Sequence, residues 1–321
     1  MGVNQVLVRS GIRGSVDRLA DRLASWLWPL AVLNLLVNIG IIVTGAAVRL
    51  TGSGLGCPTW PRCTEESYVT HPSMGLHGAI EFGNRLLTFV LVAVAVLCFV
   101  AAWRARDRFA FWSTLVVALG VPLQAVIGGI TVLTDLNPWI VSLHLVASLA
   151  MVMVCLGLLD HLRSPERPAA STTMQAVATA ILAVGWVVLY LGTIVTGAGP
   201  HAGDADAVRN GLDPARTTGF HGAAVAVLVA LTLLLLALAV RAGNRWLTVV
   251  TGALLGLEVL QGVIGLTQYA LDLPELLVAL HMLGAALLAA GFARVWLAVR
   301  PHRTVQTHTG RVFAWATRSG R

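Results

Sequence analysis

The chain has 321 residues, of which 57% are hydrophobic and 12% are charged, and this composition excludes an ordinary soluble globular domain. The high apolar content also excludes a disordered chain, and four scattered cysteines exclude a disulfide-rich scaffold. The formal net charge is +7, and every basic residue is arginine. Because these arginines lie between apolar runs, membrane insertion explains them better than nucleic-acid binding, and we expect no nucleic-acid partner.

Eight apolar runs are long enough to cross a hydrocarbon core of about 30 Å, which takes roughly 20 helical residues. In chain order they are expected at about 25–48, 78–102, 109–133, 139–160, 175–198, 220–240, 246–270 and 276–298. The predicted fold class is therefore all-α, a polytopic membrane protein with eight transmembrane helices in the lipid bilayer. An even number of spans places both termini on the same side.

The arginines predict which side that is. Seventeen of the 22 lie at one end of the spans, in the N-terminal arm, the short links and the tail. Positive residues favour the cytoplasmic side, so we expect both termini in the cytoplasm and the protein in the plasma membrane. The other end carries the two longest loops, near 49–77 and 199–219, and is expected to be the working, outer face.

An internal repeat divides the chain into two halves. Residues 124–144 align with 261–281 without a gap at an offset of 137, and nine of the 21 positions are identical. Two pseudo-symmetric four-helix bundles in the same orientation are expected, related by an axis along the membrane normal. The predicted segments are a cytoplasmic arm (1–24), an N-terminal four-helix half (25–162), a cytoplasmic linker (163–174), a C-terminal four-helix half (175–299) and a cytoplasmic tail (300–321).

Four of the nine histidines lie at the outer ends of the even-numbered helices: His77, His144, His221 and His281. An imidazole at that depth is costly without a partner, and intramembrane polar groups usually mark a functional path. Paired histidines on facing helices of a four-helix bundle are a common way to hold haem iron. A hydrogen bond to a neighbouring carbonyl would explain any one of them, but the recurrence in both halves favours haem.

The two halves differ in their second ligand. His221 and His281 are 60 residues apart, and the same spacing before His144 falls on Asn84. In an alternative register, at an offset of 144, His77 matches His221 and restores a second histidine. His77 and Asn84 are about 10 Å apart along a helix and cannot present a ligand at one depth. We favour the gapless register, which predicts a saturated site for electron transfer in the second half and an incompletely ligated site in the first.

A carboxylate adds to this asymmetry. His77, Glu81 and Asn84 share one helix face, with Arg85 adjacent. The repeat partner of Glu81 is Thr218, so only the first half has the acid. One interpretation is an ion pair between Glu81 and a nearby arginine at the membrane surface. The functional interpretation is a proton-handling or cation-stabilising group beside a reacting centre.

Two of the four cysteines, Cys57 and Cys63, lie in the first outer loop, where the compartment permits a disulfide. Their spacing allows a bridge of ordinary geometry, and a structural and a redox-active bond both remain open. Cys98 and Cys155 lie inside predicted helices, where we expect them to act as packing residues.

Together these motifs resemble the haem A synthase family, membrane enzymes that oxidise a methyl group of haem O to the formyl group of haem A. The likeness covers all eight helices and comprises R-L-T-G-S-G-L-G-C and W-P-x-C after the first helix, E-x-x-[H]-R at the start of the second, and L-H at the starts of the fourth and eighth. It implies haem B held by His221 and His281 in the C-terminal half. It also implies substrate haem O in the N-terminal half, near His144 and Glu81.

The same resemblance makes Cys57 and Cys63 an extracytoplasmic disulfide pair. The chain departs from the family's pattern at Asn84, where better-known members have histidine. His77 then becomes the fallback ligand of the substrate iron, and Arg85 completes the expected substrate-binding set.

The sequence therefore predicts a haem-dependent membrane oxidoreductase, a haem A synthase that supplies haem A to a terminal oxidase by successive hydroxylations of haem O. Haem B is the expected cofactor, and haem O synthase and cytochrome oxidase assembly factors are the expected partners. The alternative is a non-catalytic bis-histidine diheme membrane electron carrier, which predicts saturated ligation in both halves. A transporter built from parallel repeats has the right topology but gives no reason for histidines at equivalent depths.

Overall fold

The computed structural model describes residues 23–163 and 167–300. Most of the predicted N-terminal arm, nearly all of the tail and part of the linker lie outside these residues. Within them the long elements are all helices, and each is long and apolar enough to cross a membrane. They are α2 (Leu27–Leu50), α3 (Gly75–Ala105), α4 (Arg108–Leu133), α5 (Pro138–Arg163), α6 (Thr172–Ala198), α7 (Pro214–Arg241), α8 (Arg245–Ala270) and α9 (Glu275–Ala298), with a short 3-10 turn, η1 (Pro72–Met74), before α3. The predicted all-α fold with eight spans is confirmed.

The largest difference from the predicted boundaries is the start of α7, which begins six residues before the apolar run. Asp213 caps this helix, because its side chain accepts hydrogen bonds from the backbone N–H groups of Ala215 and Arg216. Pro214 follows at the first helical position, where its fixed φ favours a helix and its missing N–H costs nothing. Capping chemistry therefore starts the helix in polar sequence, outside the apolar run.

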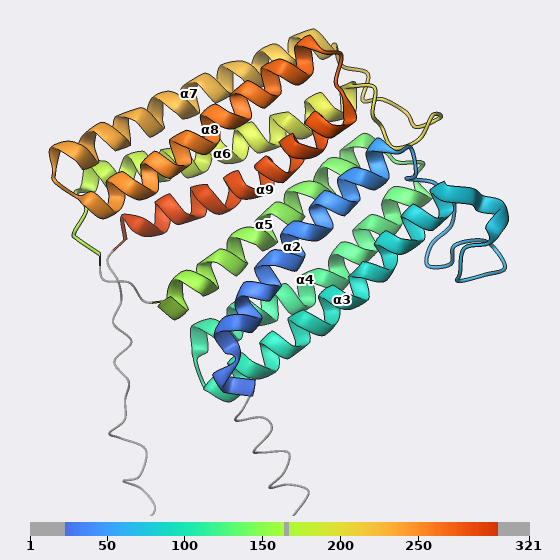
Figure 1. The fold of residues 1–321 in the computed structure, drawn as a ribbon, viewed down its shortest axis with the longest axis horizontal. Coiled ribbons are helices and arrows are strands. Elements are labelled where there is room, and N and C mark those ends of the chain that lie inside the picture. Colours follow the sequence, from blue (N-terminus) through green and yellow to red (C-terminus); the bar gives the residue numbers. More distant parts are fainter. Residues whose placement is uncertain (1–22, 164–166, 301–321) are drawn as a thin grey trace, which may run out of the picture.

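The helices form two four-helix groups (Figure 1). In the first, α2, α3, α4 and α5 contact one another in a ring, and in the second α6, α7, α8 and α9 do the same. Within the described helices, the diagonal pairs α3 and α5, and α7 and α9, make no backbone contact. The halves meet through α2 and α5 on one side and α6 and α9 on the other, with α5 and α9 side by side. This arrangement agrees with the predicted pseudo-two-fold relation.

The backbone between the third and fourth helix of each half repeats as well. Asp135 and Leu136 have φ of 50° and 57°, and Asp272 and Leu273 have φ of 56° and 62°. Such left-handed conformations are uncommon outside glycine, so their recurrence at an offset of 137 reflects one shared turn. In both turns the leucine N–H donates to a backbone carbonyl five residues earlier. This turn sets where α5 and α9 begin, and hence the depth of the histidines that they carry.

A buried charge cluster joins the halves at the end that we predict to be cytoplasmic. Asp160, near the end of α5, is contacted by the guanidinium groups of Arg167 and Arg294. Arg167 also donates to the backbone carbonyl of Leu297 on α9. The cluster therefore holds the first half to the last helix of the second.

Candidate functional site

The second bundle places two histidines on diagonally opposite helices. His221 lies within the first two turns of α7 and His281 within the first two turns of α9. In each ring Nδ1 is buried and has no hydrogen-bond partner of ordinary geometry among the described residues. The two rings are close enough to interact electrostatically, and the backbone carbonyl of Val188 on α6 lies near His221. Two imidazoles on opposite sides of a bundle core are suited to hold haem iron between them.

Glycines on the neighbouring helices set the position of these rings. A methyl group at Gly192 on α6 would lie 3.4 Å from Cε1 of His221, and one at Gly265 on α8 would lie 3.4 Å from Cε1 of His281. Each imidazole therefore packs edge-on against bare backbone of the adjacent helix. Alanine at either position would make an ordinary van der Waals contact with the ring, whereas a longer side chain would compete with the ring for this space.

The first bundle repeats half of this arrangement. A methyl group at Gly128 on α4 would lie 3.3 Å from Cε1 of His144 on α5, and the buried Nδ1 of His144 also lacks a described partner. Gln124 donates to the backbone carbonyl of His144 at 2.9 Å and also contacts the hydroxyl of Ser148. His144 thus packs against glycine in the same way as its repeat partner, His281 in α9. In addition, its backbone carbonyl accepts a hydrogen bond from Gln124.

Asn84 occupies the position diagonally opposite His144, on α3. Its Oδ1 accepts a hydrogen bond of 2.8 Å from the hydroxyl of Thr44 on α2. One turn below Thr44, a methyl group at Gly40 would meet no atom within 4 Å. In the first half the space beside Gly40 of α2 is therefore open. In the second half the ring of His221 occupies the space beside Gly192 of α6.

His77 lies two turns further out and is exposed. Its Nδ1 is 3.0 Å from the hydroxyl of Ser53, in the first outer loop. The structure therefore brings Glu81 and Asn84 to the bundle side of α3 and leaves His77 at the loop.

Glu81 is buried, with 5% of its surface exposed, and both of its carboxylate oxygens are engaged. Oε2 accepts the backbone N–H of Cys57 at 2.6 Å, and Oε1 is contacted by Nη2 and Nε of Arg85 at 2.5 and 3.1 Å. Arg85 also donates to the backbone carbonyls of Cys57, Thr59 and Arg62. The pair thus fastens the first outer loop to α3, as the ion-pair interpretation of Glu81 expected, while a role in the reaction stays a prediction.

The first outer loop also reaches across to α4. Cys57 and Cys63 form a disulfide, as the resemblance implied. Between them, Trp60 packs on Gly129: a methyl group there would lie 2.7 Å from Cγ of the indole. Gly128 faces His144 and Gly129 faces Trp60. Two adjacent glycines of α4 therefore make room for the histidine ring of α5 and for the tryptophan ring of the first outer loop.

The contacts of these histidines and of Trp60 with glycine were not predicted from the sequence, although the sequence repeat contained part of the information. The glycine that ends the shared Q-x-V-I-G string is Gly128 in one half and Gly265 in the other, which is the residue facing each repeat-related histidine. The contact of Trp60 had no such signal, because it joins a loop to a helix about 70 residues away.

Fold and site together define a polytopic helical membrane protein with two repeat-related bundles, each carrying half-buried histidine at its loop-bearing end. A family model described as "Cytochrome oxidase assembly protein" matches residues 28–207, more than half of the chain. The chain belongs to this family, and the matched residues contain α2 to α6.

Several curated relatives named "Heme A synthase" are similar over shorter segments. The relative from Geobacillus thermodenitrificans is 31% identical over 148 residues, 44% of each chain. That from Lysinibacillus sphaericus is 30% identical over 118 residues, 36% of this chain and 38% of the relative. That from Bacillus pumilus is 26% identical over 181 residues, 52% of this chain and 57% of the relative. The matches thus span roughly half or less of these relatives' length, and the resemblance to haem A synthases stated from the sequence is confirmed.

Proposed function

We propose that this protein is a haem A synthase that oxidises one ring methyl of haem O to a formyl group. Two successive hydroxylations would give a gem-diol, which loses water to form the aldehyde. The observation that carries the proposal is the asymmetry of two repeat-related sites. One site presents His221 and His281, whereas the other presents His144 opposite an amide that is hydrogen-bonded to Thr44.

The residues of the second bundle fit a resident haem B. His221 and His281 each bury an Nδ1 atom without a described partner of ordinary geometry, and each ring has a glycine behind it. Histidine binds haem iron through Nε2, so the fit rests on the two rings standing on diagonal helices of one bundle and on their glycine contacts, not on Nδ1. Haem B held there would supply one-electron transfer to the first site. The two imidazoles would fix its position, and the closely packed glycines would fix the imidazoles.

In the first bundle, His144 would bind the iron of haem O from the α5 side. Trp60 would form the outer wall of the substrate site, because Gly129, on which it packs, adjoins the glycine facing His144. Glu81 lies one turn outward from Asn84 on the same helix face. Its oxygens accept three hydrogen bonds, two on Oε1 and one on Oε2, so Oε2 keeps a lone pair for a further partner. The ion pair with Arg85 supports the cation-stabilising role, with Arg85 and the amide of Cys57 as positioning groups.

The rival function, a diheme electron carrier, requires a second imidazole in the first half. His77 is exposed and contacts Ser53, and Asn84 bonds to Thr44. Neither arrangement favours bis-histidine ligation around His144. We further propose a plasma-membrane location with cytoplasmic termini and both haem sites toward the outer face. Haem O synthase would supply the substrate, and assembly factors of cytochrome oxidase would receive the product.

Expression of the full chain with a source of haem O, followed by extraction of the pigments, tests the proposal. Wild type should yield haem A. His281→Ala should lose bound haem B and all haem A, Glu81→Ala should lose haem A while keeping haem B, and His144→Ala should keep haem B but lose bound haem O and haem A. His77→Ala is the matched control and should resemble wild type.

Unconverted haem O in the wild type and in every variant would favour the carrier and overturn the enzyme. Loss of haem O binding in His77→Ala, at a level equal to His144→Ala, would overturn the gapless register instead. The two results are distinguishable, because the first leaves haem content unchanged and the second does not.

A further inference from the structure

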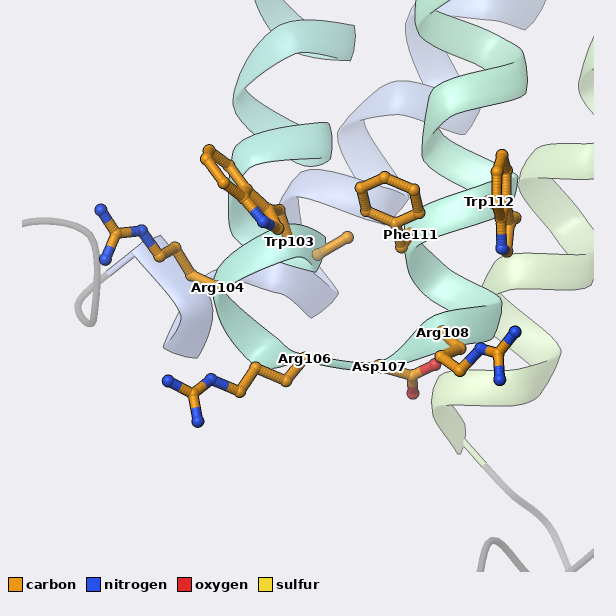
Figure 2. A pocket seen from close by; sticks show the side chains of 8 residues that line it. Trp103, Arg104, Arg106, Asp107, Arg108, Phe111 and Trp112 are labelled. Atoms are coloured by element: carbon orange, nitrogen blue, oxygen red, sulfur yellow. The ribbon is translucent and has the colours of Figure 1, made fainter. Parts of the chain in front are cut away.

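The turn between α3 and α4, at the end that we predict to be cytoplasmic, encloses a pocket of about 750 Å³. Its lining combines three arginines with aromatic side chains, and only one of its residues is acidic. Figure 2 shows the guanidinium groups of Arg104 and Arg106 on one side of the turn and that of Arg108 on the other. The positive charges therefore bracket the pocket. The ring of Phe111 lies above it, between the two helices, and the ring of Trp103 lies over α3.

The acidic residue of the pocket, Asp107, is committed to other groups. Its carboxylate accepts the backbone N–H of Ala110 at 3.0 Å, and its other oxygen lies 2.7 Å from Nε2 of His161 on α5. Burial raises the pKa of Asp107, but these hydrogen bonds outweigh it and hold that pKa below its ordinary value. The carboxylate of Asp107 is therefore engaged with α4 and α5, and the guanidinium groups of Arg106 and Arg108 leave positive charge at the pocket.

An apolar groove of about 380 Å³ adjoins the pocket and shares Arg108 and Trp112 with it. It runs along α4 past Val116 and is closed on one side by Val154 of α5. Trp103 and Trp112 are 59% and 57% exposed, which is typical of tryptophan at the level of lipid head groups. A cationic pocket that opens into an apolar groove at this level is complementary to a phospholipid, which has an anionic phosphate and an apolar acyl chain.

The repeat-related turn of the second half has the same backbone and keeps two of the three arginines, as Arg241 and Arg245, but Val240 and Val249 stand in place of the two tryptophans. At an offset of 137, Arg108 corresponds to Arg245 and Arg106 to Gly243. Both Arg106 and Gly243 have positive φ, 56° and 65°. This conformation suits glycine and is costly for a side chain, so an arginine held there is a candidate for function. The aromatic residue of the second turn, Trp246, is already covered by Arg294 at 4.7 Å.

We propose that the α3–α4 turn binds an anionic phospholipid, with its phosphate between Arg106 and Arg108 and one acyl chain in the groove along α4. Guanidinium groups pair with phosphate oxygens in fixed geometry, and basic pockets at the cytoplasmic ends of helices recognise anionic head groups. The lipid would hold the α3–α4 end of the first bundle in the membrane plane.

Titration of the detergent-purified full chain with phosphatidylglycerol, phosphatidylcholine or inorganic phosphate, monitored by native mass spectrometry, tests this site. Each arginine near a lipid surface contributes roughly a factor of five, so the double variant R106Q/R108Q should bind phosphatidylglycerol about thirtyfold more weakly than wild type. The matched double variant R241Q/R245Q, at the equivalent turn, should bind as wild type does. Arg106→Gly restores the backbone preference of the turn and should fold normally while binding roughly fivefold more weakly.

Equal weakening by both double variants would show a diffuse basic surface and overturn the site. Unchanged affinity in both would overturn it too. Inorganic phosphate that competes as strongly as phosphatidylglycerol would show a free-anion site and overturn the lipid, as would phosphatidylcholine binding of equal strength.

Discussion

The substitution Gly129→Ala should displace the ring of Trp60, which packs on Gly129 beside His144. The new Cβ would lie 2.7 Å from Cγ of the indole, closer than real Cβ contacts allow, and the indole is held in a loop tied by a disulfide and by Arg85. Overpacking of this kind costs about 1–3 kcal/mol. Alanine in place of glycine inside a helix gains about 1 kcal/mol. The net effect of Gly129→Ala should therefore lie between neutral and a loss of about 2 kcal/mol.

The chain contains a matched control for this substitution. A methyl group at Gly262, inside α8, would meet no atom within 4 Å, so Gly262→Ala should show the helix gain alone. The two variants should differ by about 1–3 kcal/mol in free energy of unfolding. Cys98 and Cys155 are free and buried, so a thiol-reactive dye that labels them on heating reports unfolding in detergent. Haem A yield, measured in parallel, should fall in Gly129→Ala and stay unchanged in Gly262→Ala.

A double-mutant cycle separates the clash from other effects of the methyl group. In a Trp60→Ala background the indole is gone, so Gly129→Ala should become neutral or stabilising, as neighbouring residues that share one contact are not additive. If Gly129→Ala destabilises equally with and without Trp60, or matches Gly262→Ala in stability and haem A yield, then Trp60 does not pack on this helix and the proposed wall is wrong.

Three further predictions concern the ends of the bundles. Asp160→Asn should lower the free energy of unfolding by about 3–5 kcal/mol, because it leaves Arg294 and a second arginine without their buried counter-charge; the dye assay measures this. Arg106→Gly should raise the free energy of unfolding by about 1 kcal/mol, because glycine adopts the left-handed conformation without strain; an unchanged or lower value would refute strain at this turn. Asn84→His should place a second imidazole opposite His144, and the haem-loaded variant should gain a second low-spin signal in electron paramagnetic resonance; an unchanged spectrum would contradict the gapless register.

Periodicity and hydropathy were sufficient to predict the helices and the two halves, because a membrane span is defined by its own residues. The histidines could be paired across the repeat for the same reason, since a turn such as that at Asp135 and Asp272 is encoded locally and copied in both halves. The helix start at Pro214 was missed because a cap satisfies backbone groups outside the apolar run. Hydropathy cannot detect such a cap.

The partners of the functional side chains were harder to predict, because they come from loops. An ion pair was one of two interpretations of Glu81, and it does pair with Arg85, yet its Oε2 accepts the backbone N–H of Cys57, which no residue pattern encodes. The contact between Trp60 and Gly129 likewise depends on the path of a loop between its anchors. Side chains bound to backbone or to bare helix surface leave no complementary residue to recognise in the sequence.

The two halves thus differ in their outer loops as well as in helix residues such as Glu81 and Asn84 of α3. The second outer loop contacts both bundles: Nε2 of His201 lies 2.9 Å from the carbonyl of Leu273, before α9, and Gly54 of the first outer loop donates to the carbonyl of Gly203 at 2.8 Å. Arg49, at the end of α2, donates to the carbonyls of His201 in this loop and Thr196 in α6. Both loops therefore converge on the outer end of the first bundle. If the proposed function holds, exchange of the first outer loop should abolish haem A formation while leaving bound haem B unchanged, because His221 and His281 lie on α7 and α9 of the other bundle.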